Sequence, residues 1–502
     1  MNYSPRNMHV WDAWCMPVGD KVHVYHLQRG RPGTKVTDTQ QDCLGHAVSG
    51  NLVDWEECPH ALAPDLVSKQ DNWQMWTGCA VWHDNRGYLF YTMRGSESRG
   101  MIQKIGLATS ADGNRWERHP RNPVIVPDPK WYATDERPVK DIVDCRDLIV
   151  ARAPDGAGWF GFYATRQPGK ELPETSVIAC VYSPDLVKWE HRPPAFAPKK
   201  YACVEVPDVF PLNGKWYLTC LTGNFYGNQG IWSDPNMVGG TMFAVSDRPE
   251  GPYEELKENV LVAGRYSAPI TCRSVLFENE RHLLYTDREK DGLTDSGSGT
   301  FGTLSTPKLL KTDGDRLYAA YSPRIESRVT DELIGAANPL KPRGGDIWGQ
   351  VWQMPSATWK FGDTVEGESR TGWGVVPLGV KAESFIFEAT ITLDKKGAAG
   401  VALRMDGPMS GAVAVLDART QSVYFGEAPS FEFVERRLTT LPAKRPIHLR
   451  VVNRLEHVEI YVNDDMRLAF SRYRGIGGEV GLFVDRAKAV FSNIRLRALR
   501  VE

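Results

Sequence analysis

The chain has 502 residues, of which 42% are hydrophobic and 10% aromatic, so it is long enough for more than one domain with its own core. Its 60 basic and 62 acidic residues give a formal net charge of -2, which excludes the strongly basic balance of proteins that bind nucleic acids or anionic membranes. No apolar run is long enough to cross a bilayer. We therefore expect neither a nucleic acid nor a membrane as partner.

Five similar aromatic-rich segments each predict the second strand of a β-hairpin. They are VHVYHLQ from Val22, YLFYTMR from Tyr88, WFGFYAT from Trp159, WYLTCLT from Trp216 and HLLYTDR from His282. A turn-forming stretch and an apolar strand precede each segment, as in a hairpin. The segments start 66, 71, 57 and 66 residues apart. Repeats of this length, each with several short strands, are typical of propeller blades.

A second marker follows four of the five segments. It is an apolar strand that ends in Ser and is followed six or seven residues later by an aromatic residue, at Trp55, Trp116, Trp189 and Tyr253. Most of these aromatics are expected to pack between blades rather than to bind ligands. Four strands per repeat give five blades in about 320 residues. The predicted fold is therefore all-β, with a five-bladed β-propeller over residues 1–325.

Three carboxylates stand at nearly the same place in three of the repeats. Asp12, Asp147 and Glu205 lie 10 to 12 residues before an aromatic-rich strand, each in the predicted first strand of its blade. In a propeller the first strands line the central channel, so these acids should converge on one funnel. Carboxylates that share a partly closed cleft raise one another's pKa, so one can be ionised while another holds a proton. Cleavage of a glycosidic bond requires such a pair.

The nine cysteines all lie in the first 272 residues and form no CxxC pair. A thiolate metal site is therefore not expected, and no cofactor or metal is predicted. Cys145 and Cys203, close to two of the acids, are expected to pack as small apolar side chains. The opening segment shows no basic region followed by an apolar stretch. Together with reduced thiols, this favours the cytoplasm.

The pattern changes after the predicted propeller. Residues 326–350 mix a short helical pattern with Pro and Gly and are predicted to be a connector. Residues 351–502 carry about eight alternating segments, among them SFIFEATITLD, GAVAVLDA and EVGLFVDR. Short strands with hairpin turns predict a two-sheet β-sandwich. Its expected role is structural or in subunit contacts, with carbohydrate binding as the alternative, and the pattern specifies no oligomeric state.

Five motifs in order resemble glycoside hydrolase family 32, the invertase, inulinase and levanase group. They are LGHAVSGNLVDWEECPHALAPD at 44, WTGCAVW at 76, CRDLIV at 145, VEVPDVF at 204 and GTLSTPKLLKTDGDRLYAAYSPRIESRV at 302. CRDLIV resembles the RDP motif of that family, and VEVPDVF resembles its ECPDLF motif. Members of the family carry a five-bladed propeller followed by a β-sandwich, as the repeats here predict.

The resemblance implies a role for each acid. Asp12 is the nucleophile, Glu205 the general acid/base, and Asp147, beside Arg146, the stabiliser of the transition state. The mechanism is then retaining, with the carboxyls of Asp12 and Glu205 about 5 to 5.5 Å apart. The residues expected to contact the substrate are Trp11, Gln28, Trp76, Thr77, Arg146 and Asp208. For Asp208, a strand-end hydrogen bond is an equal alternative.

The chain also departs from the family pattern. The usual opening WMNDPNG is replaced by HVWDAWCMPVGD, whose VWDAW resembles the WDSW of the related levansucrase family. RDP becomes RDL at Leu148, and ECP becomes EVP at Val206. These positions surround the sugar-binding subsite, so the changes bear on the substrate more than on the mechanism.

The expected activity is retaining hydrolysis of β-fructofuranosides, such as sucrose or short fructo-oligosaccharides. The alternatives are a fructosyltransferase, a hydrolase of another furanoside or of an unusual fructose-containing disaccharide, and a non-catalytic sugar-binding protein. The loop that starts GNFYGNQ at Gly223 is either a platform for the leaving group or a surface loop packed on its own aromatics.

Overall fold

A computed structural model describes residues 2–35, 42–171, 173–226, 232, 234–264, 270–340, 348–349, 357–394, 396–407 and 409–500. Within these residues almost all regular structure is β-strand, and the only helices are four short 3₁₀ turns. The all-β prediction is therefore confirmed. No helix in the described part of the chain is long and apolar enough to cross a membrane.

The N-terminal part begins with four successive groups of four antiparallel strands. The first group is β1 (Met8–Val18), β2 (Lys21–Gly30), β3 (Leu44–Ser49) and β4 (Glu56–Leu62). The second is β5 (Gln74–His83), β6 (Arg86–Arg94), β7 (Gln103–Ser110) and β8 (Glu117–Arg118). The third is β9 (Cys145–Arg152), β10 (Trp159–Arg166), β11 (Ser176–Ser183) and β12 (Glu190–Phe196). The fourth is β13 (Glu205–Leu212), β14 (Lys215–Gly223), β15 (Gly239–Ser246) and β16 (Glu254–Gly264).

The fifth group is less regular, and it connects to the first. It consists of β17 (Ile270–Phe277), β18 (Glu280–Lys290), β19 (Gly299–Leu304), β20 (Lys308–Asp313) and β21 (Arg316–Tyr321). One end of β18 pairs with β19 and the other with β20, so two strands share the third position. β19 also pairs with β1, through Val10 and Gly302. All five predicted aromatic segments are therefore second strands, β2, β6, β10, β14 and β18.

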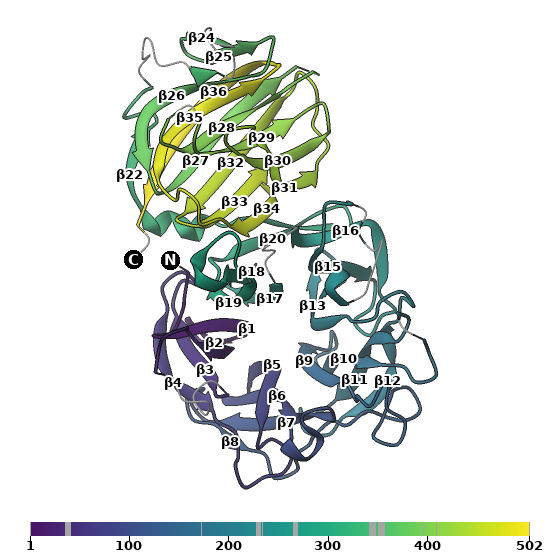
Figure 1. Ribbon diagram of the computed structural model, residues 1–502. Coiled ribbons are helices and arrows are strands. Elements are labelled where there is room, and N and C mark those ends of the chain that lie inside the picture. Colours follow the sequence, from purple (N-terminus) through teal and green to yellow (C-terminus); the bar gives the residue numbers. More distant parts are fainter. Residues whose placement is uncertain are drawn as a thin grey trace.

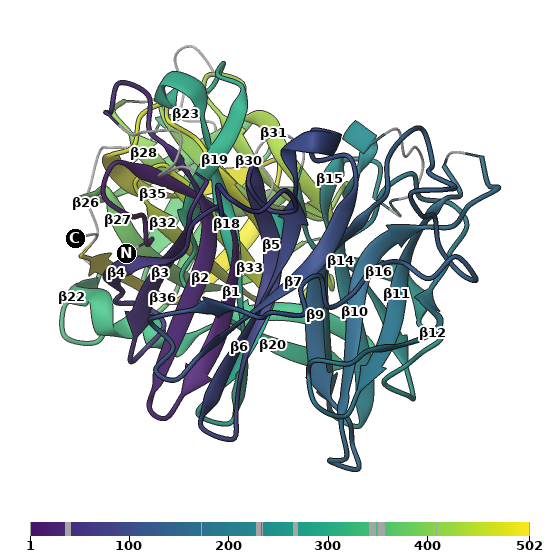
Figure 2. The same ribbon diagram turned by 90° about the horizontal axis from the view of Figure 1, so that it is seen from below.

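The five groups surround a common centre. β1, β5, β9, β13 and β17 lie innermost and contact one another in succession, with β17 next to β1 (Figure 1). Viewed from below, neighbouring groups stand side by side (Figure 2). Residues at one end of these five strands therefore face a shared space, and Asp12, Asp147 and Glu205 all lie on innermost strands.

Every innermost strand has a β-bulge near its acid or the equivalent residue. The pairing register shifts between Val10 and Ala13, Trp76 and Cys79, Glu205 and Asp208, Ile270 and Arg273, and opposite Phe162 to Ala164 in the third group. Asp147 and Val206 adopt positive φ values of 64 and 50 at these bulges. A bulge twists the strand and re-aims a side chain, and positive φ is costly for a β-branched residue such as Val206. The acids therefore owe their direction to local irregularities that the repeat pattern does not reveal.

The C-terminal part consists of two sheets with an apolar core between them. One sheet has the order β23 (Trp348–Gly349), β26 (Trp373–Ala382), β35 (Gly478–Asp485), β28 (Ala398–Met405), β29 (Ala412–Asp417), β30 (Ser422–Glu427) and β31 (Glu432–Leu438). The other contains β24 (Ala357–Phe361), β25 (Val365–Ser369), β36 (Lys488–Leu499), β27 (Ser384–Leu393), β32 (Pro446–Arg454), β33 (His457–Val462) and β34 (Asp465–Ser471). Their inward faces share one apolar cluster that includes Phe387, Val401, Leu449 and Leu482.

The predicted connector contains a strand of the second of these sheets. β22 (Val329–Ile334) follows a 3₁₀ turn at Pro323–Arg328 and pairs with β36. Residues 341–347 and 350 of the connector, and 351–356 at the start of the predicted sandwich, lie outside the described residues. The chain therefore enters the C-terminal sheet soon after leaving the fifth group.

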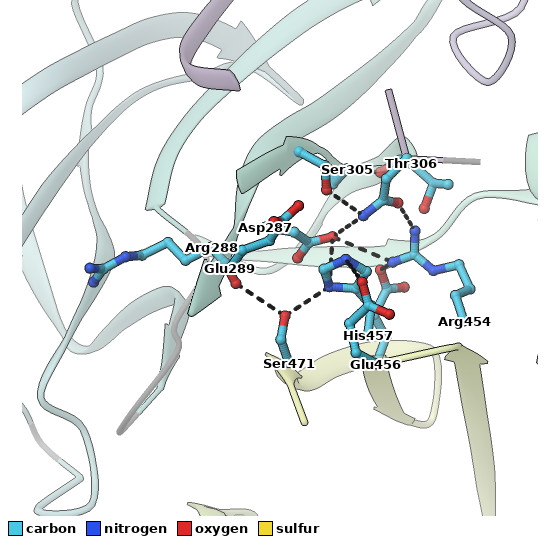
Figure 3. A network of polar contacts seen from close by, with 12 residues as sticks. Asp287, Arg288, Glu289, Ser305, Thr306, Arg454, Glu456, His457 and Ser471 are labelled. Carbon is cyan, nitrogen blue, oxygen red and sulfur yellow. Dashed lines mark hydrogen bonds and ion pairs between the residues drawn. The ribbon is translucent and has the colours of Figure 1, made fainter. Parts of the chain in front are cut away.

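A buried polar network joins the two parts of the chain (Figure 3). Nη2 of Arg454, on β32, lies 3.6 Å from Oδ2 of Asp287 on β18. Ser471, on β34, donates a hydrogen bond of 3.1 Å to the carbonyl of Arg288 and lies 2.8 Å from Nδ1 of His457. The Arg288 side chain points away from this network (Figure 3). β18 therefore gives alternate side chains to the interface and to the opposite side.

Candidate active site

The three predicted acids meet in one cavity of about 530 Å³ at the centre of the five groups. It is lined by Trp11, Asp12, Leu27, Trp76, Thr77, Arg146, Asp147, Glu205, Leu221, Phe225, Tyr226, Ile270, Thr271, Arg288 and Phe301. The lining combines aromatic faces with a few convergent polar groups, the usual composition of a small-molecule site. Aromatic faces of this kind also suit the apolar faces of sugar rings.

Asp12 lines the cavity and is buried, with an exposed fraction of 5%. Its Oδ2 accepts a hydrogen bond from the hydroxyl of Thr77, and its Oδ1 has no hydrogen-bond partner among the described residues. Burial, followed by the charge of Asp147, raises the pKa of Asp12 to about 8. The hydrogen bond from Thr77 and the charge of Arg273 oppose this shift. Removing either would make Asp12 harder to ionise.

Arg146 contacts two of the three acids, Asp147 and Glu205, and also Asp144. Its Nε lies 3.4 Å from Oδ2 of Asp147, its Nη2 3.2 Å from Oε2 of Glu205, and its Nη1 2.5 Å from Oδ1 of Asp144. Burial alone would lower the pKa of Arg146, but the surrounding carboxylates, Asp144 first, raise it well above its ordinary value. The guanidinium is therefore a permanent charge that fixes the spacing of Asp147 and Glu205.

Asp147 is held by its backbone as well as by its carboxylate. Its Oδ2 accepts a 3.0 Å hydrogen bond from the N–H of Val206, and its own N–H donates to Thr92 Oγ1 at 3.1 Å. Nη2 of Arg273 donates to its carbonyl at 3.0 Å. Burial raises the pKa of Asp147 above its ordinary value, against the opposing charge of Arg146. Residues from three other strands thus hold Asp147, two through its backbone and one through its carboxylate.

Glu205 is the most accessible of the three acids, with its side chain 19% exposed against 3% for Asp147. Its Oε1 accepts a hydrogen bond from the hydroxyl of Tyr226, and its Oε2 faces Arg146. The site therefore combines two buried acids, Asp12 and Asp147, with the more accessible Glu205.

The remaining predicted substrate contacts divide into three groups. Trp11, Trp76 and Thr77 line the cavity, together with Arg146. Gln28 lines an adjoining pocket of about 610 Å³ that shares Trp76, Leu27 and Phe301 with the cavity, and its Nε2 lies 2.9 Å from Nε2 of His60. Asp208 lies outside the cavity and is buried; its Oδ2 accepts a 2.6 Å hydrogen bond from the N–H of Ser274. This position agrees with the alternative prediction for Asp208, a hydrogen bond at the end of a strand.

Two polar or aromatic cavity residues from the fifth group, Arg288 and Phe301, were not predicted. Phe225 and Tyr226 also line the cavity; they come from the loop that starts at Gly223, for which a platform for the leaving group was one of two predictions. Residues 227–231 and 233 of this loop lie outside the described residues. The sequence carries a signal for one residue of the fifth group. Arg288 stands six residues after the start of its aromatic segment, at the same position as Gln28 and Arg94 in their segments. Aligning the ends of the second strands would have identified this ring of polar residues.

Neither a metal centre nor a reactive thiol stands out at the site. In the ranges that the structure describes, no three His, Cys, Asp or Glu side chains are arranged to hold a metal ion. Cys203 lies 3.4 Å from Nη2 of Arg146, yet burial raises the pKa of its thiol well above the ordinary range. Burial also raises the pKa of Cys145. Both thiols are therefore protonated at neutral pH and pack against their neighbours.

Comparison with known families and curated proteins points to one family. The Glycosyl hydrolases family 32 N-terminal domain matches residues 20–269, a segment that contains Asp147 and Glu205 and begins after Asp12. A beta-fructofuranosidase 1 from Zea mays is 36% identical over 160 residues, 29% of this chain and 23% of that protein. A sucrose-6-phosphate hydrolase from Zymomonas mobilis is 24% identical over 324 residues, 59% of this chain and 58% of that protein. The matched segments thus span between about a quarter and three fifths of these relatives.

Solved structures share the fold along the whole chain. A sucrose-6-phosphate hydrolase from Lactobacillus gasseri aligns with a TM-score of 0.70 at 14% identity, covering 100% of this chain and 93% of that one. A fructan 1-exohydrolase IIa from Cichorium intybus, in complex with 1-kestose, aligns with a TM-score of 0.69 at 16% identity, covering 99% and 97%. Both the family match and the fold agree with the motif resemblance. The chain belongs to glycoside hydrolase family 32.

Proposed function

We propose that the protein is a retaining glycoside hydrolase that cleaves β-fructofuranosides, such as sucrose or short fructo-oligosaccharides. The observation that carries the proposal is the convergence of Asp12, Asp147 and Glu205 in one cavity, with Asp12 buried and Glu205 more accessible. A second line of support is the family membership, whose curated relatives include beta-fructofuranosidases. No cofactor takes part in this chemistry.

In the first step, the Asp12 carboxylate attacks the anomeric carbon of the fructosyl unit. Glu205 transfers its proton to the glycosidic oxygen, the bond to the leaving sugar breaks, and a covalent fructosyl-enzyme forms. Glu205 suits this role because its carboxyl lies close to solvent and its Oε1 is oriented by Tyr226. The leaving sugar therefore departs past Glu205.

In the second step, water enters on the side that the leaving sugar has vacated. The Glu205 carboxylate takes a proton from this water, which attacks the anomeric carbon and releases Asp12. The fructose product retains its configuration because two inversions have occurred. If a second sugar hydroxyl replaces the water, the same step produces transfer, which is the alternative activity.

Asp147 stabilises the positive charge that develops on the sugar ring between the two steps. Its carboxylate is held in place by the N–H of Val206 and by Arg146 before substrate arrives, so it need not reorganise during the reaction. Trp11, Trp76, Thr77 and Arg146 are proposed to contact the sugar, and Gln28 to contact it from the adjoining pocket. Asp208 is proposed to hold neighbouring strands together through its bond to Ser274 and not to contact the sugar.

The high pKa of Asp12 gives the reaction an unusual pH requirement. A nucleophile with a pKa of about 8 is mostly protonated at pH 7, and only the ionised fraction can attack. As pH is raised from acid values, kcat/KM should therefore keep rising to a higher pH than it would with a nucleophile of ordinary carboxyl pKa. The positive charge that develops on the sugar ring in the transition state favours the ionised form of Asp12.

The proposed architecture is a five-bladed β-propeller over residues 1–325, a connector over 326–350 and a β-sandwich over 351–502. It is supported by the five strand groups around a common centre and by the two packed sheets that follow (Figure 1). The VWDAW segment around Asp12 is proposed to be of the levansucrase type. A cytoplasmic location is proposed from the nine free cysteines.

Incubation with sucrose, short inulin and levan oligosaccharides, followed by product chromatography, tests the proposal. Free fructose as the main product is the expected result. New, longer oligosaccharides would establish transfer instead. The proposal fails if no fructoside is cleaved while an arabinofuranoside or another furanoside is. Binding of fructosides without any cleavage would favour the non-catalytic alternative.

A further inference from the structure

The hairpin of β18 and β19 contributes two residues, Arg288 and Phe301, to the catalytic cavity. The guanidinium of Arg288 lies 5.9 Å from the ring centroid of Trp11, and the ring centroids of Phe301 and Trp11 are 4.0 Å apart. The Nε of Arg288 makes no hydrogen bond to any described residue. A guanidinium carries five N–H donors, and sugar hydroxyls accept such bonds. The hairpin therefore offers both an aromatic face and a hydrogen-bond donor to a sugar in the cavity.

Packing against the hairpin, and not an ionic partner, holds the Arg288 side chain. Burial lowers its pKa, and among the described groups only Tyr226 opposes this shift. A Cβ on Gly299, the first residue of β19, would overlap Nη2 of Arg288. The guanidinium therefore lies against the backbone of β19, and its place in the cavity depends on where the hairpin lies.

One segment of the C-terminal sheets, residues 471–474, binds the other side of this hairpin. Ser471 donates a 3.1 Å hydrogen bond to the carbonyl of Arg288, whose side chain points away from the contact (Figure 3). Two residues further along β18, the N–H of Lys290 donates a 3.1 Å hydrogen bond to the hydroxyl of Tyr473. The 471–474 segment therefore fixes the backbone of the residue whose side chain lines the cavity.

The connection between β18 and β19 is held by the same segment, through Asp295. Oδ1 of Asp295 accepts a 3.0 Å hydrogen bond from the N–H of Tyr473, and Oδ2 accepts one of 3.2 Å from the N–H of Arg474. Nε of Arg472 lies 3.4 Å from Oδ1 of Asp295. Nζ of Lys290 donates a 2.7 Å hydrogen bond to the carbonyl of Asp295 and so ties this connection to the end of β18. Three successive residues of the segment thus contact one carboxylate of the hairpin.

The 471–474 segment is itself anchored within the C-terminal sheets. Buried Arg404, on β28, donates hydrogen bonds of 2.9 Å to the carbonyl of Arg472 and of 2.5 Å to that of Leu455. The side chain of Arg472 donates two bonds, of 2.9 Å and 2.7 Å, to the carboxylate of Glu427. A pair with two such bonds fixes the geometry of both side chains. The segment therefore has a position of its own that it can impose on the hairpin.

We propose that Arg288 binds hydroxyl groups of the substrate and that the 471–474 segment positions Arg288 through the hairpin of β18 and β19. This inference rests on the proposed function, because that function places a sugar in the cavity. Arg288 contacts the sugar, whereas Ser471 and Asp295 are positioning residues that act through Arg288. The C-terminal part, for which a structural role or subunit contacts were expected, then also contributes to substrate binding.

Substitution of Arg288 tests the sugar contact. R288M keeps much of the length of the side chain but removes its donors, so KM for sucrose should rise at least about tenfold while kcat changes less than about threefold. G299A keeps the charge but displaces the guanidinium, and it should raise KM in the same direction. Calorimetric titration of sucrose into D12N and into D12N with R288M measures the same loss of affinity without turnover. An R288M protein that melts at the wild-type temperature and has the wild-type KM would overturn the inference.

A double-mutant cycle tests the positioning. S471A and D295N should each raise KM for sucrose about three- to tenfold, with little change in kcat, because a displaced Arg288 binds the sugar less well. In the R288M background neither substitution should raise KM further, since their effect passes through Arg288. Increases in KM that are equal with and without Arg288 would overturn the positioning role.

D464N is the matched control for D295N. Asp464 also joins the two parts of the chain, since it lies 3.2 Å from Nζ of Lys311 and 2.8 Å from Nη1 of Arg450, but these ion pairs do not involve the hairpin of β18 and β19. D464N should leave KM for sucrose within about twofold of the wild type. A rise in KM as large as that of D295N would overturn the inference, because loosening of the contact anywhere would then have the same effect.

Measuring both binding and cleavage of sucrose separates this inference from the proposed function. If the wild type cleaves sucrose and R288M does so with an unchanged KM, the inference fails and the proposed function stands. If the wild type binds sucrose in the titration but cleaves no fructoside, the proposed function fails, and the dissociation constants of R288M, S471A and D295N decide the inference in the same way. A wild type that neither binds nor cleaves a fructoside would overturn both.

Discussion

The hydroxyl of Thr77, on β5, donates a hydrogen bond to Oδ2 of Asp12, on β1 of the neighbouring group. This bond crosses from one sheet to the next, 65 positions along the chain. It lowers the pKa of Asp12, whereas burial and Asp147 raise it. The protonation of the proposed nucleophile is therefore set partly by a residue of a different repeat.

Replacing Thr77 by valine should shift the acid limb of kcat/KM to higher pH. Valine keeps the shape of the side chain but removes the donor, so the ionised form of Asp12 loses support and its pKa rises further. At pH 7 the loss in kcat/KM should be about tenfold. T77S, which keeps the hydroxyl, is the matched control and should show the wild-type profile. An unchanged acid limb in T77V would mean that Asp12 is not the group that titrates.

Replacing Asp12 by asparagine should stabilise the protein at neutral pH. The folded-state pKa of about 8 lies above the ordinary value of 3.8, so the folded state binds this proton more tightly than the unfolded chain. The contribution of Asp12 to stability is fully present below pH 4 and is lost as pH rises towards 8. D12N removes this loss, so at pH 8 its free energy of unfolding should exceed that of the wild type by on the order of 2 kcal/mol or more.

Thermal denaturation of D12N and wild type between pH 4 and pH 8 measures this effect. The difference in melting temperature should grow with pH across this range, because the penalty for ionising a buried Asp12 grows with it. D147N should show a smaller effect in the same direction, since burial also raises the pKa of Asp147. A difference that is constant with pH would show that D12N acts on packing rather than on ionisation.

Replacing Tyr226 by phenylalanine should lower kcat more than it changes KM. The Tyr226 hydroxyl orients Oε1 of Glu205, while Arg146 faces Oε2, so both oxygens of the proposed acid/base are fixed. Without the hydroxyl, Glu205 should populate other rotamers, and kcat should fall about tenfold. F225L is the control, because Phe225 lines the same cavity but makes no bond to Glu205. If kcat falls equally in Y226F and F225L, the loss comes from a disturbed loop and not from the missing hydrogen bond to Glu205.

Replacing Glu459 by glutamine should destabilise the contact between the two parts of the chain. Glu459, on β33, lies 2.9 Å from Nζ of Lys308 and 2.5 Å from Nη2 of Arg454, and all three are buried. Burial alone would raise the pKa of Glu459, but the charges of Lys308 and Arg454 lower it to about 2. E459Q leaves two cations without their shared anion, which should cost about 3 to 5 kcal/mol of unfolding free energy at pH 7.

Chemical denaturation checks this prediction, and its pH dependence has a defined sign. A carboxylate whose folded pKa is depressed stabilises the fold above its ordinary pKa of 4.5 and loses that contribution as pH falls towards 2. The difference in unfolding free energy between wild type and E459Q should therefore decrease as pH falls from 4.5 towards 2. E456Q is a suitable control, because Glu456 is more exposed and, within the described part of the chain, its carboxylate forms an ion pair with His457 alone. If E456Q loses as much unfolding free energy as E459Q, the prediction that Glu459 stabilises the contact through its two buried cations is wrong.

The repeat pattern predicted most of the strands because each has a strong local signature. The aromatic segments are second strands, and Asp12, Asp147 and Glu205 lie on innermost strands, as equivalent repeat positions require. The bulges could not be predicted, because the extra residue that redirects the Asp147 side chain does not change the pattern of apolar and polar residues along the strand in a recognisable way. Such irregularities depend on contacts between sheets, as in the bond from Val206 to Asp147.

The ion pairs of the site could not be predicted from the sequence either. Arg146 was identified from its position next to Asp147, but its contact with Asp144 follows from folding. Arg94 and Arg288 occupy equivalent repeat positions, yet nothing in the repeat indicates that Arg94 bonds to the carbonyl of Gly100 and to Gln74. For Asp208 the sequence left a substrate contact and a strand-end hydrogen bond as equal alternatives, and its Oδ2 accepts a hydrogen bond from the backbone N–H of Ser274.

The initial rate of fructose release from sucrose by wild type, D12N and E205Q tests the central claim most directly. The account predicts release by the wild type and a loss of at least about a thousandfold in D12N, because the covalent step has no nucleophile. E205Q should also lose most of its activity, and both variants should melt no lower than a few degrees below the wild type. A D12N protein that retains more than about a tenth of the wild-type rate would contradict the assignment of Asp12 as nucleophile.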